Sequence, residues 1–228
     1  MNKISCISRL SCQSFGMMKT RAGFTKYHLF AAQNAASTAS EIENKYKSAT
    51  PSQNDLDLYL SQISTAIICS VAALESNINE YIIDHKEHID TASVISEPKV
   101  LKKYGKTPKK HVPNNNELSK VLLQNTNLIF KYDIVWFIKK KDLLPENKHK
   151  HDIRYLTKLR NALTHFTPEW SNALSKHINL KKGRKNRFTL NPFYAPGSLF
   201  FPYHCLSASC AMWSCKVSNE FLMLFKSL

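Results

Sequence analysis

Three residues in the C-terminal half of the chain have side chains suited to phosphodiester chemistry: Arg160, Asn161 and His165, within the segment RNALTH. A histidine can take or give a proton near neutral pH. An arginine keeps its positive charge and holds phosphate oxygens with a planar set of N–H donors. Together these residue types indicate the binding or cleavage of a phosphodiester.

These three residues need a helix to position them, and the sequence predicts one over 152–166, which Pro168 ends. Its apolar residues fall on or near one face of that helix: Ile153, Leu156, Leu159, Leu163 and Phe166. Asn161 and His165 are four positions apart and therefore share a face, whereas Arg160 and His165 are separated by about 140° around the axis. A long arginine could reach around the helix, and a second copy of the chain across a twofold axis would complete a shared groove.

The charge of the chain favours a polyanionic partner, since 32 Lys and Arg residues oppose 17 Asp and Glu residues for a formal net charge of +15. The basic residues gather in three stretches, at 97–116, 139–150 and 176–187, and two of these adjoin the helix with the RNALTH segment. Solvated loops are the alternative interpretation of such stretches. The candidate contacts to an RNA backbone are Lys102, Lys103, Lys109, Lys110, Lys181, Lys182, Arg184 and Arg187.

The apolar spacing and the scarcity of glycine, with five in 228 residues, predict an all-α fold. Helices are expected at 19–46, 52–88, 116–131, 152–166 and 207–226, with a short apolar turn at 134–138. We expect an up-and-down helical bundle of about five helices, in one domain over 19–228. Residues 1–18 are expected to form a flexible, disordered N-terminal arm.

Several other classes of protein are not favoured by the sequence. The six cysteines form no Cys-x-x-Cys pair, which favours free thiols in a reducing cytoplasm, and we expect no metal and no cofactor. No run of eighteen apolar residues occurs, so we expect no membrane span. A DNA-binding protein is disfavoured because no helix-turn-helix pattern is evident.

The arrangement of these segments resembles HEPN domains, which carry an Arg-x(4–6)-His signature near the end of the penultimate helix. The RNALTH segment matches that signature. The run ALESNINEY at 73–81 resembles the second-helix pattern of these domains, and the segment 201–225, with Trp213 inside a helix, resembles the way many of them end. The resemblance extends over residues 19–225.

The resemblance implies a metal-independent endoribonuclease that acts as a homodimer and leaves a 2′,3′-cyclic phosphate and a 5′-hydroxyl. His165 would act as general base or acid on the ribose 2′-OH, and Arg160 would hold the scissile phosphate. Asn161 would orient His165 or contact the phosphate, while Glu75 would support these side chains from behind. HEPN domains also include toxins controlled by an antitoxin and phage-defence effectors. The alternative is a non-catalytic HEPN-like module that binds RNA or a partner protein.

Overall fold

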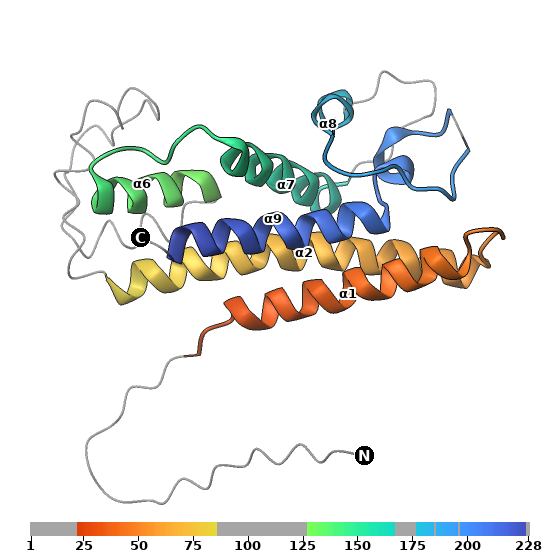
Figure 1. Cartoon of the computed structure of the whole chain (residues 1–228), viewed down its shortest axis with the longest axis horizontal. Helices are drawn as coiled ribbons and strands as arrows, with labels where there is room; N and C mark the ends of the chain where they lie inside the picture. The colour runs from red at the N-terminus through yellow and green to blue at the C-terminus, as the bar shows by residue number, and fades with distance from the viewer. Residues whose placement is uncertain (1–21, 86–126, 167–176, 185, 196, 227–228) are drawn as a thin grey trace, which may run out of the picture.

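The computed structural model describes residues 22–85, 127–166, 177–184, 186–195 and 197–226, and within these ranges the chain forms helices and no strand (Figure 1). The predicted all-α fold is therefore confirmed. The expected arm at 1–18 and most of the expected helix at 116–131 lie outside the described residues.

Three long helices form the main bundle: α1 (Thr25–Lys45), α2 (Gln53–Asp84) and α9 (Ala208–Lys226). Helices α1 and α2 form an antiparallel hairpin, and α9 packs along both of them (Figure 1). The buried side of α1 consists mainly of alanines at three- and four-residue spacing: Ala32, Ala35, Ala36 and Ala39. Because alanine is small, these positions let the backbones of neighbouring helices approach closely.

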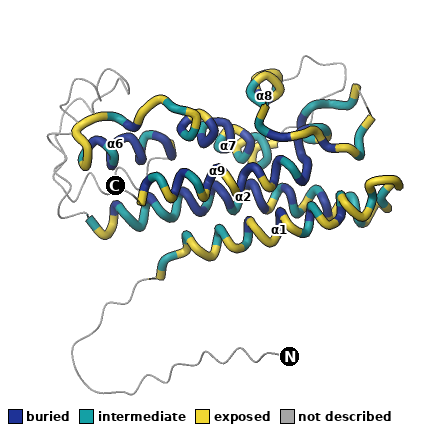
Figure 2. Tube along the Cα trace, viewed as in Figure 1, coloured by how far each residue is buried: buried dark blue, intermediate teal, exposed yellow. Residues whose placement is uncertain are grey.

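A second layer covers the side of α2 and α9 that faces away from α1. It consists of α6 (Leu128–Lys140), α7 (Lys148–Thr164), the short α8 (Ile178–Gly183) and the short turn η1 (Phe200–His204). Helix α7 contacts both α2 and α9, whereas α6 contacts α2 and α7. The most buried parts of the chain lie where the two layers meet (Figure 2). Helix α7 is therefore held by the core of the protein along its inner side.

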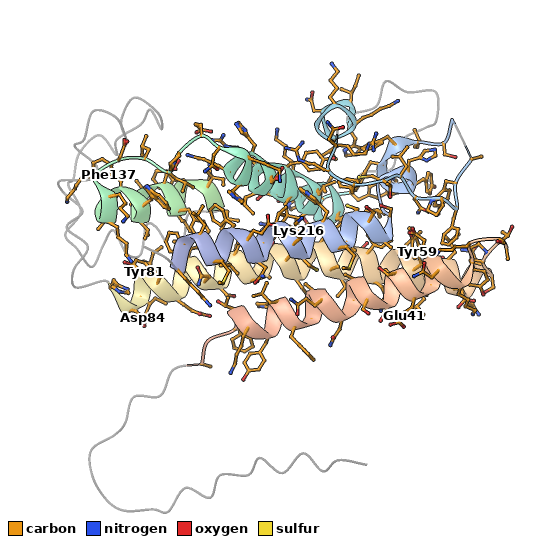
Figure 3. The ribbon with its side chains drawn as sticks, viewed as in Figure 1. Glu41, Tyr59, Tyr81, Asp84, Phe137 and Lys216 are labelled. Carbon is orange, nitrogen blue, oxygen red and sulfur yellow. The ribbon has the colours of Figure 1, made fainter. Side chains whose placement is uncertain are left out.

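The start of α9 is fixed by a hydrogen-bonded junction with α1 and α2. The backbone N–H of Ala208 donates to Glu43 Oε2 and to the Tyr59 hydroxyl oxygen, at 3.0 Å each, and Tyr59 donates to Glu43. Tyr59 is fully buried at this junction, where its label stands in Figure 3. Burial, together with the bond to the Glu43 carboxylate, raises the pKa of the Tyr59 phenol far above its usual value.

Side-chain hydrogen bonds hold the first turn of each helix in the α1–α2 hairpin. At the α2 end, the Ser52 side chain accepts a hydrogen bond from the Asp55 backbone N–H at 3.2 Å and so caps the helix. At the α1 end, the Glu80 carboxylate accepts hydrogen bonds from the backbone N–H groups of Phe24 and Thr25, at 2.7 and 3.2 Å. Glu80, which belongs to α2, therefore caps the N-terminus of α1, where the N-cap residue Phe24 makes no side-chain hydrogen bond.

A buried ion pair joins α6 to α7. Lys150 Nζ lies 2.7 Å from Asp133 Oδ1, and neither side chain is exposed. Lys150 also donates to the Leu144 carbonyl oxygen at 2.7 Å and lies 3.2 Å from a Glu146 carboxylate oxygen. These contacts tie the loop between the two helices to the first turn of α7, where the Asn147 side chain accepts from the Lys150 N–H.

The predicted helices at 19–46, 52–88, 152–166 and 207–226 correspond to α1, α2, α7 and α9. The prediction of an apolar turn at 134–138 is wrong, because these residues lie inside α6. The run LIFKYDIVWFI has no proline or glycine to break it, and Asn127 caps its start by accepting from Phe130 N–H. The stretch 139–150 was also expected to be a basic loop, yet Lys148–Lys150 form the first turn of α7.

Among the described helices, α2 is long and apolar enough to cross a membrane by length and composition. Core helices pass the same test, and α2 contacts α1, α6, α7 and α9 along its length. The apolar character of α2 is thus explained by its position in the bundle. The absence of a membrane span stays a prediction.

We expect Lys150→Ala to lower the free energy of unfolding by about 3–5 kcal/mol, because it leaves the buried Asp133 carboxylate without the ammonium group. The matched control is Lys148→Ala, whose side chain is 78% exposed and lies 3.6 Å from Asp152. That change should alter the free energy of unfolding by no more than about 0.5 kcal/mol. Urea unfolding followed by circular dichroism measures both, and equal losses would contradict a structural role for the buried pair.

Candidate functional site

The three residues of the predicted site lie at the C-terminal end of α7. Arg160 and Asn161 are in its last turns, and His165 follows Thr164 as the residue that ends the helix. The His165 backbone N–H donates to the Asn161 carbonyl oxygen at 3.0 Å, and the Thr164 hydroxyl donates to the Arg160 carbonyl oxygen at 3.0 Å. These bonds hold the end of α7 in a defined conformation.

Arg160 is turned inward, toward α2. Its Nη2 donates to Glu75 Oε1, and the two side chains are 22% and 38% exposed. Within the described part of the chain, the buried Nε of Arg160 has no hydrogen-bond partner. The guanidinium group is therefore anchored through one nitrogen and remains reachable from solvent at the interface between α2 and α7.

Glu75 belongs to a larger polar cluster at this interface. One turn further along α2, Asn79 accepts a hydrogen bond from Lys131 Nζ of α6 at 2.9 Å. Burial lowers the pKa of Lys131, and the negative charge of Glu75 acts in the opposite direction. Glu75 is thus close to two basic side chains, since it forms an ion pair with Arg160 and acts electrostatically on Lys131.

Asn161 and His165 lie on the other side of α7 and are exposed. As the spacing predicts, they share a face, and the structure does not bring His165 into contact with Arg160. The difference in direction of about 140° between positions 160 and 165 explains why. In one chain, the arginine is therefore at the α2–α7 interface, while the asparagine and the histidine are on the outer surface.

The predicted RNA-binding residues have different surroundings. Lys181 and Lys182 are exposed on α8. Arg184 donates to the Phe188 carbonyl oxygen at 2.9 Å, and Arg187 Nε donates to Asp152 Oδ1 at 2.8 Å, so both arginines help to hold the loop after α8. The remaining candidates lie outside the described residues: Lys102, Lys103, Lys109 and Lys110.

Sequence reasoning missed the polar outer face of α7, which leads to His165. His151 and Lys158 are exposed there, and Arg154 is partly exposed. The signal was available in the sequence, because residues 151, 158 and 165 are spaced by seven, and a spacing of seven returns to nearly the same side of a helix.

No family model, curated protein or solved structure matches this chain. The resemblance to HEPN domains therefore stays a prediction from the quoted sequence segments. In the described ranges, no group of three or more His, Cys, Asp or Glu side chains is placed to hold a metal ion.

The contact between Glu75 and Arg160 can be measured with a double-mutant cycle of Glu75→Gln and Arg160→Gln. Because both side chains are partly exposed, we expect a coupling free energy of about 0.5–1 kcal/mol. The reference pair on α9 is Lys216 and Glu220, which are 3.9 Å apart, and the Lys216 side chain is 70% exposed (Lys216 is labelled in Figure 3). Its coupling should be smaller, about 0.3 kcal/mol, and strictly additive effects at Glu75 and Arg160 would show that the ion pair is absent in solution.

Proposed function

We propose that this protein is a metal-independent endoribonuclease that cleaves RNA by attack of a ribose 2′-OH on the adjacent phosphodiester. The proposal depends chiefly on one observation. Asn161 and His165 are exposed at the end of the basic helix α7. Arg160 directly precedes Asn161, and its guanidinium group is held by the Glu75 carboxylate. The HEPN-like signature is formed by the same three residues.

In the proposed reaction, His165 takes the proton from the 2′-OH or gives a proton to the leaving 5′-oxygen. Its exposure at the end of α7 leaves the imidazole accessible to a polymer substrate. Arg160 contacts the phosphate and stabilises the charge that develops on its oxygens. Asn161, on the same side of α7 as His165, contacts the phosphate or orients the imidazole. The products are a 2′,3′-cyclic phosphate and a 5′-hydroxyl.

Arg160 and His165 point in different directions within one chain, but they could meet across the interface of a homodimer. If two copies place the ends of their α7 helices together, the arginine of one protomer can act with the histidine of the other. The basic residues near α7 would then bind the RNA on both protomers. A role as a toxin restrained by an antitoxin, or as a phage-defence effector in the cytoplasm, is the biological setting that the HEPN resemblance suggests.

The competing proposal is a non-catalytic HEPN-like module that binds RNA or a partner protein. The contact between Arg160 and Glu75 favours it, because an arginine that already has a carboxylate partner can have a purely structural role. Both proposals predict binding to RNA that weakens with salt. They differ in turnover, and a cleavage assay separates them.

Cleavage of bulk RNA in the presence of EDTA tests the proposed chemistry. Wild-type protein should produce cyclic-phosphate ends, and His165→Ala should reduce the rate by about 10²–10⁴-fold because the proton transfer is lost. The control is His28→Ala, which should keep full activity, because His28 lies on α1, which α2 and α9 separate from α7 (Figure 1). RNA binding by wild-type protein without any cleavage would support the non-catalytic module instead.

Mixing two inactive variants tests the shared site. Arg160→Ala and His165→Ala proteins, combined at equal concentrations and allowed to exchange subunits, should recover about a quarter of wild-type activity. Half of the dimers are then mixed, and one of the two sites in each mixed dimer has both intact residues. If light scattering shows dimers, subunit exchange between differently labelled copies is confirmed and no activity returns, the site is formed within one chain.

A further inference from the structure

The outer face of α7 carries a continuous row of polar side chains. These are His151, Arg154, Lys158, Asn161 and His165, which fall within an arc of about 80° around the helix axis. From residue 151 to residue 165 the row is about 21 Å long, at 1.5 Å per residue. His165 of the proposed active site stands at one end of it.

This face has no exposed acidic residue of α7. The single acid in the helix is Asp152, which is 3% exposed and accepts a hydrogen bond from Arg187. Just before the helix, the Glu146 carboxylate contacts Arg154 and Lys150. Both of these acids are thus paired with basic groups of the protein, and the charged side chains that α7 itself places on this face are basic.

Helix α8 widens the basic surface. The Tyr155 hydroxyl donates to the Leu180 carbonyl oxygen at 2.9 Å, which fixes α8 beside the middle of α7. A Cβ atom on Gly183 would lie 2.6 Å from the Tyr155 ring, so glycine is needed for this close approach. Lys181 and Lys182 are therefore held on a short helix next to the outer face of α7.

We propose that the outer face of α7 binds the backbone of single-stranded RNA and leads the strand to His165, with Lys158 as the central phosphate contact. This inference rests on the proposed ribonuclease function. The row is narrow and about 21 Å long, which suits one strand better than a duplex. Attack by a 2′-OH also requires a sugar-phosphate unit that is free to change its geometry, as in loops and single strands.

Lys158 is the most informative residue in the row. It lies seven residues, or about 10.5 Å, from both His151 and His165. It is exposed, and in the part of the chain that the structure describes it forms no ion pair. Arg154, in contrast, is bound to Glu146 through two nitrogens. A phosphate could therefore contact Lys158 without breaking an existing contact.

The test measures the binding of a labelled 2′-O-methyl oligouridine, which cannot be cleaved, over a range of salt concentrations. Lys158→Gln should weaken binding several-fold and reduce the slope of log K against log salt by about 0.7, the value for one phosphate contact on a single strand. The matched control is Lys47→Gln, an exposed lysine in the α1–α2 turn, which makes the same charge change and should have little effect. Lys158→Arg should retain the slope.

Equal binding by the Lys158→Gln and Lys47→Gln proteins, both folded by circular dichroism, would overturn the inference. Tighter binding to a duplex of the same length would overturn the preference for a single strand. Cleavage of unmodified RNA by the same variants separates this inference from the proposed function. If wild-type protein does not cleave RNA but Lys158→Gln reduces the slope, the binding surface is correct and the ribonuclease is not. If wild-type protein cleaves RNA and Lys158→Gln leaves cleavage unchanged, the ribonuclease is correct and the binding surface is not. Loss of a binding contact should raise KM.

Discussion

The apolar surface of α2 determines how the other helices are arranged. Its buried side chains extend over about half of the circumference of the helix, with Ala73 and Ile82, about 180° apart, at the two limits. A helix of this kind cannot bury its apolar surface against a single neighbour. Helices α1 and α9 cover one part of it, and α6 and α7 cover another. The position of α7, and with it the direction of the proposed site residues, follows from the burial of α2.

Charge is distributed unequally between the two sides of α7. On the inner side, Lys150 is paired with Asp133 and Arg160 with Glu75, so basic residues meet acids of other helices. On the outer side, α7 itself has no exposed acid, and its exposed Lys158 forms no ion pair with any residue that the structure describes. The same helix can thus be held firmly by the protein and still attract a polyanion.

The sequence was sufficient to predict the helical class and the positions of α1, α2, α7 and α9, because apolar spacing and a breaker such as Pro51 act locally. It was insufficient for α6, whose nearly continuous apolar run has no clear period. Burial of Lys150 was also beyond prediction, since its partner Asp133 lies in that misassigned segment. The spacing predicted that Arg160 and His165 point in different directions. It could not predict that Arg160 lies beside Glu75, because these residues are 85 positions apart in the sequence.

The hydrogen bonds at the two ends of the α1–α2 hairpin have a consequence for its alignment. An interface made largely of alanines is smooth, so one helix could slide along the other by a turn of about 5.4 Å with little loss of packing. Glu80 holds the start of α1, and at the opposite end the Tyr46 hydroxyl donates to Asp55 near the start of α2. A slip by one turn would break both contacts at once. The two end contacts therefore select a single register for a pair of helices whose packing alone would tolerate several.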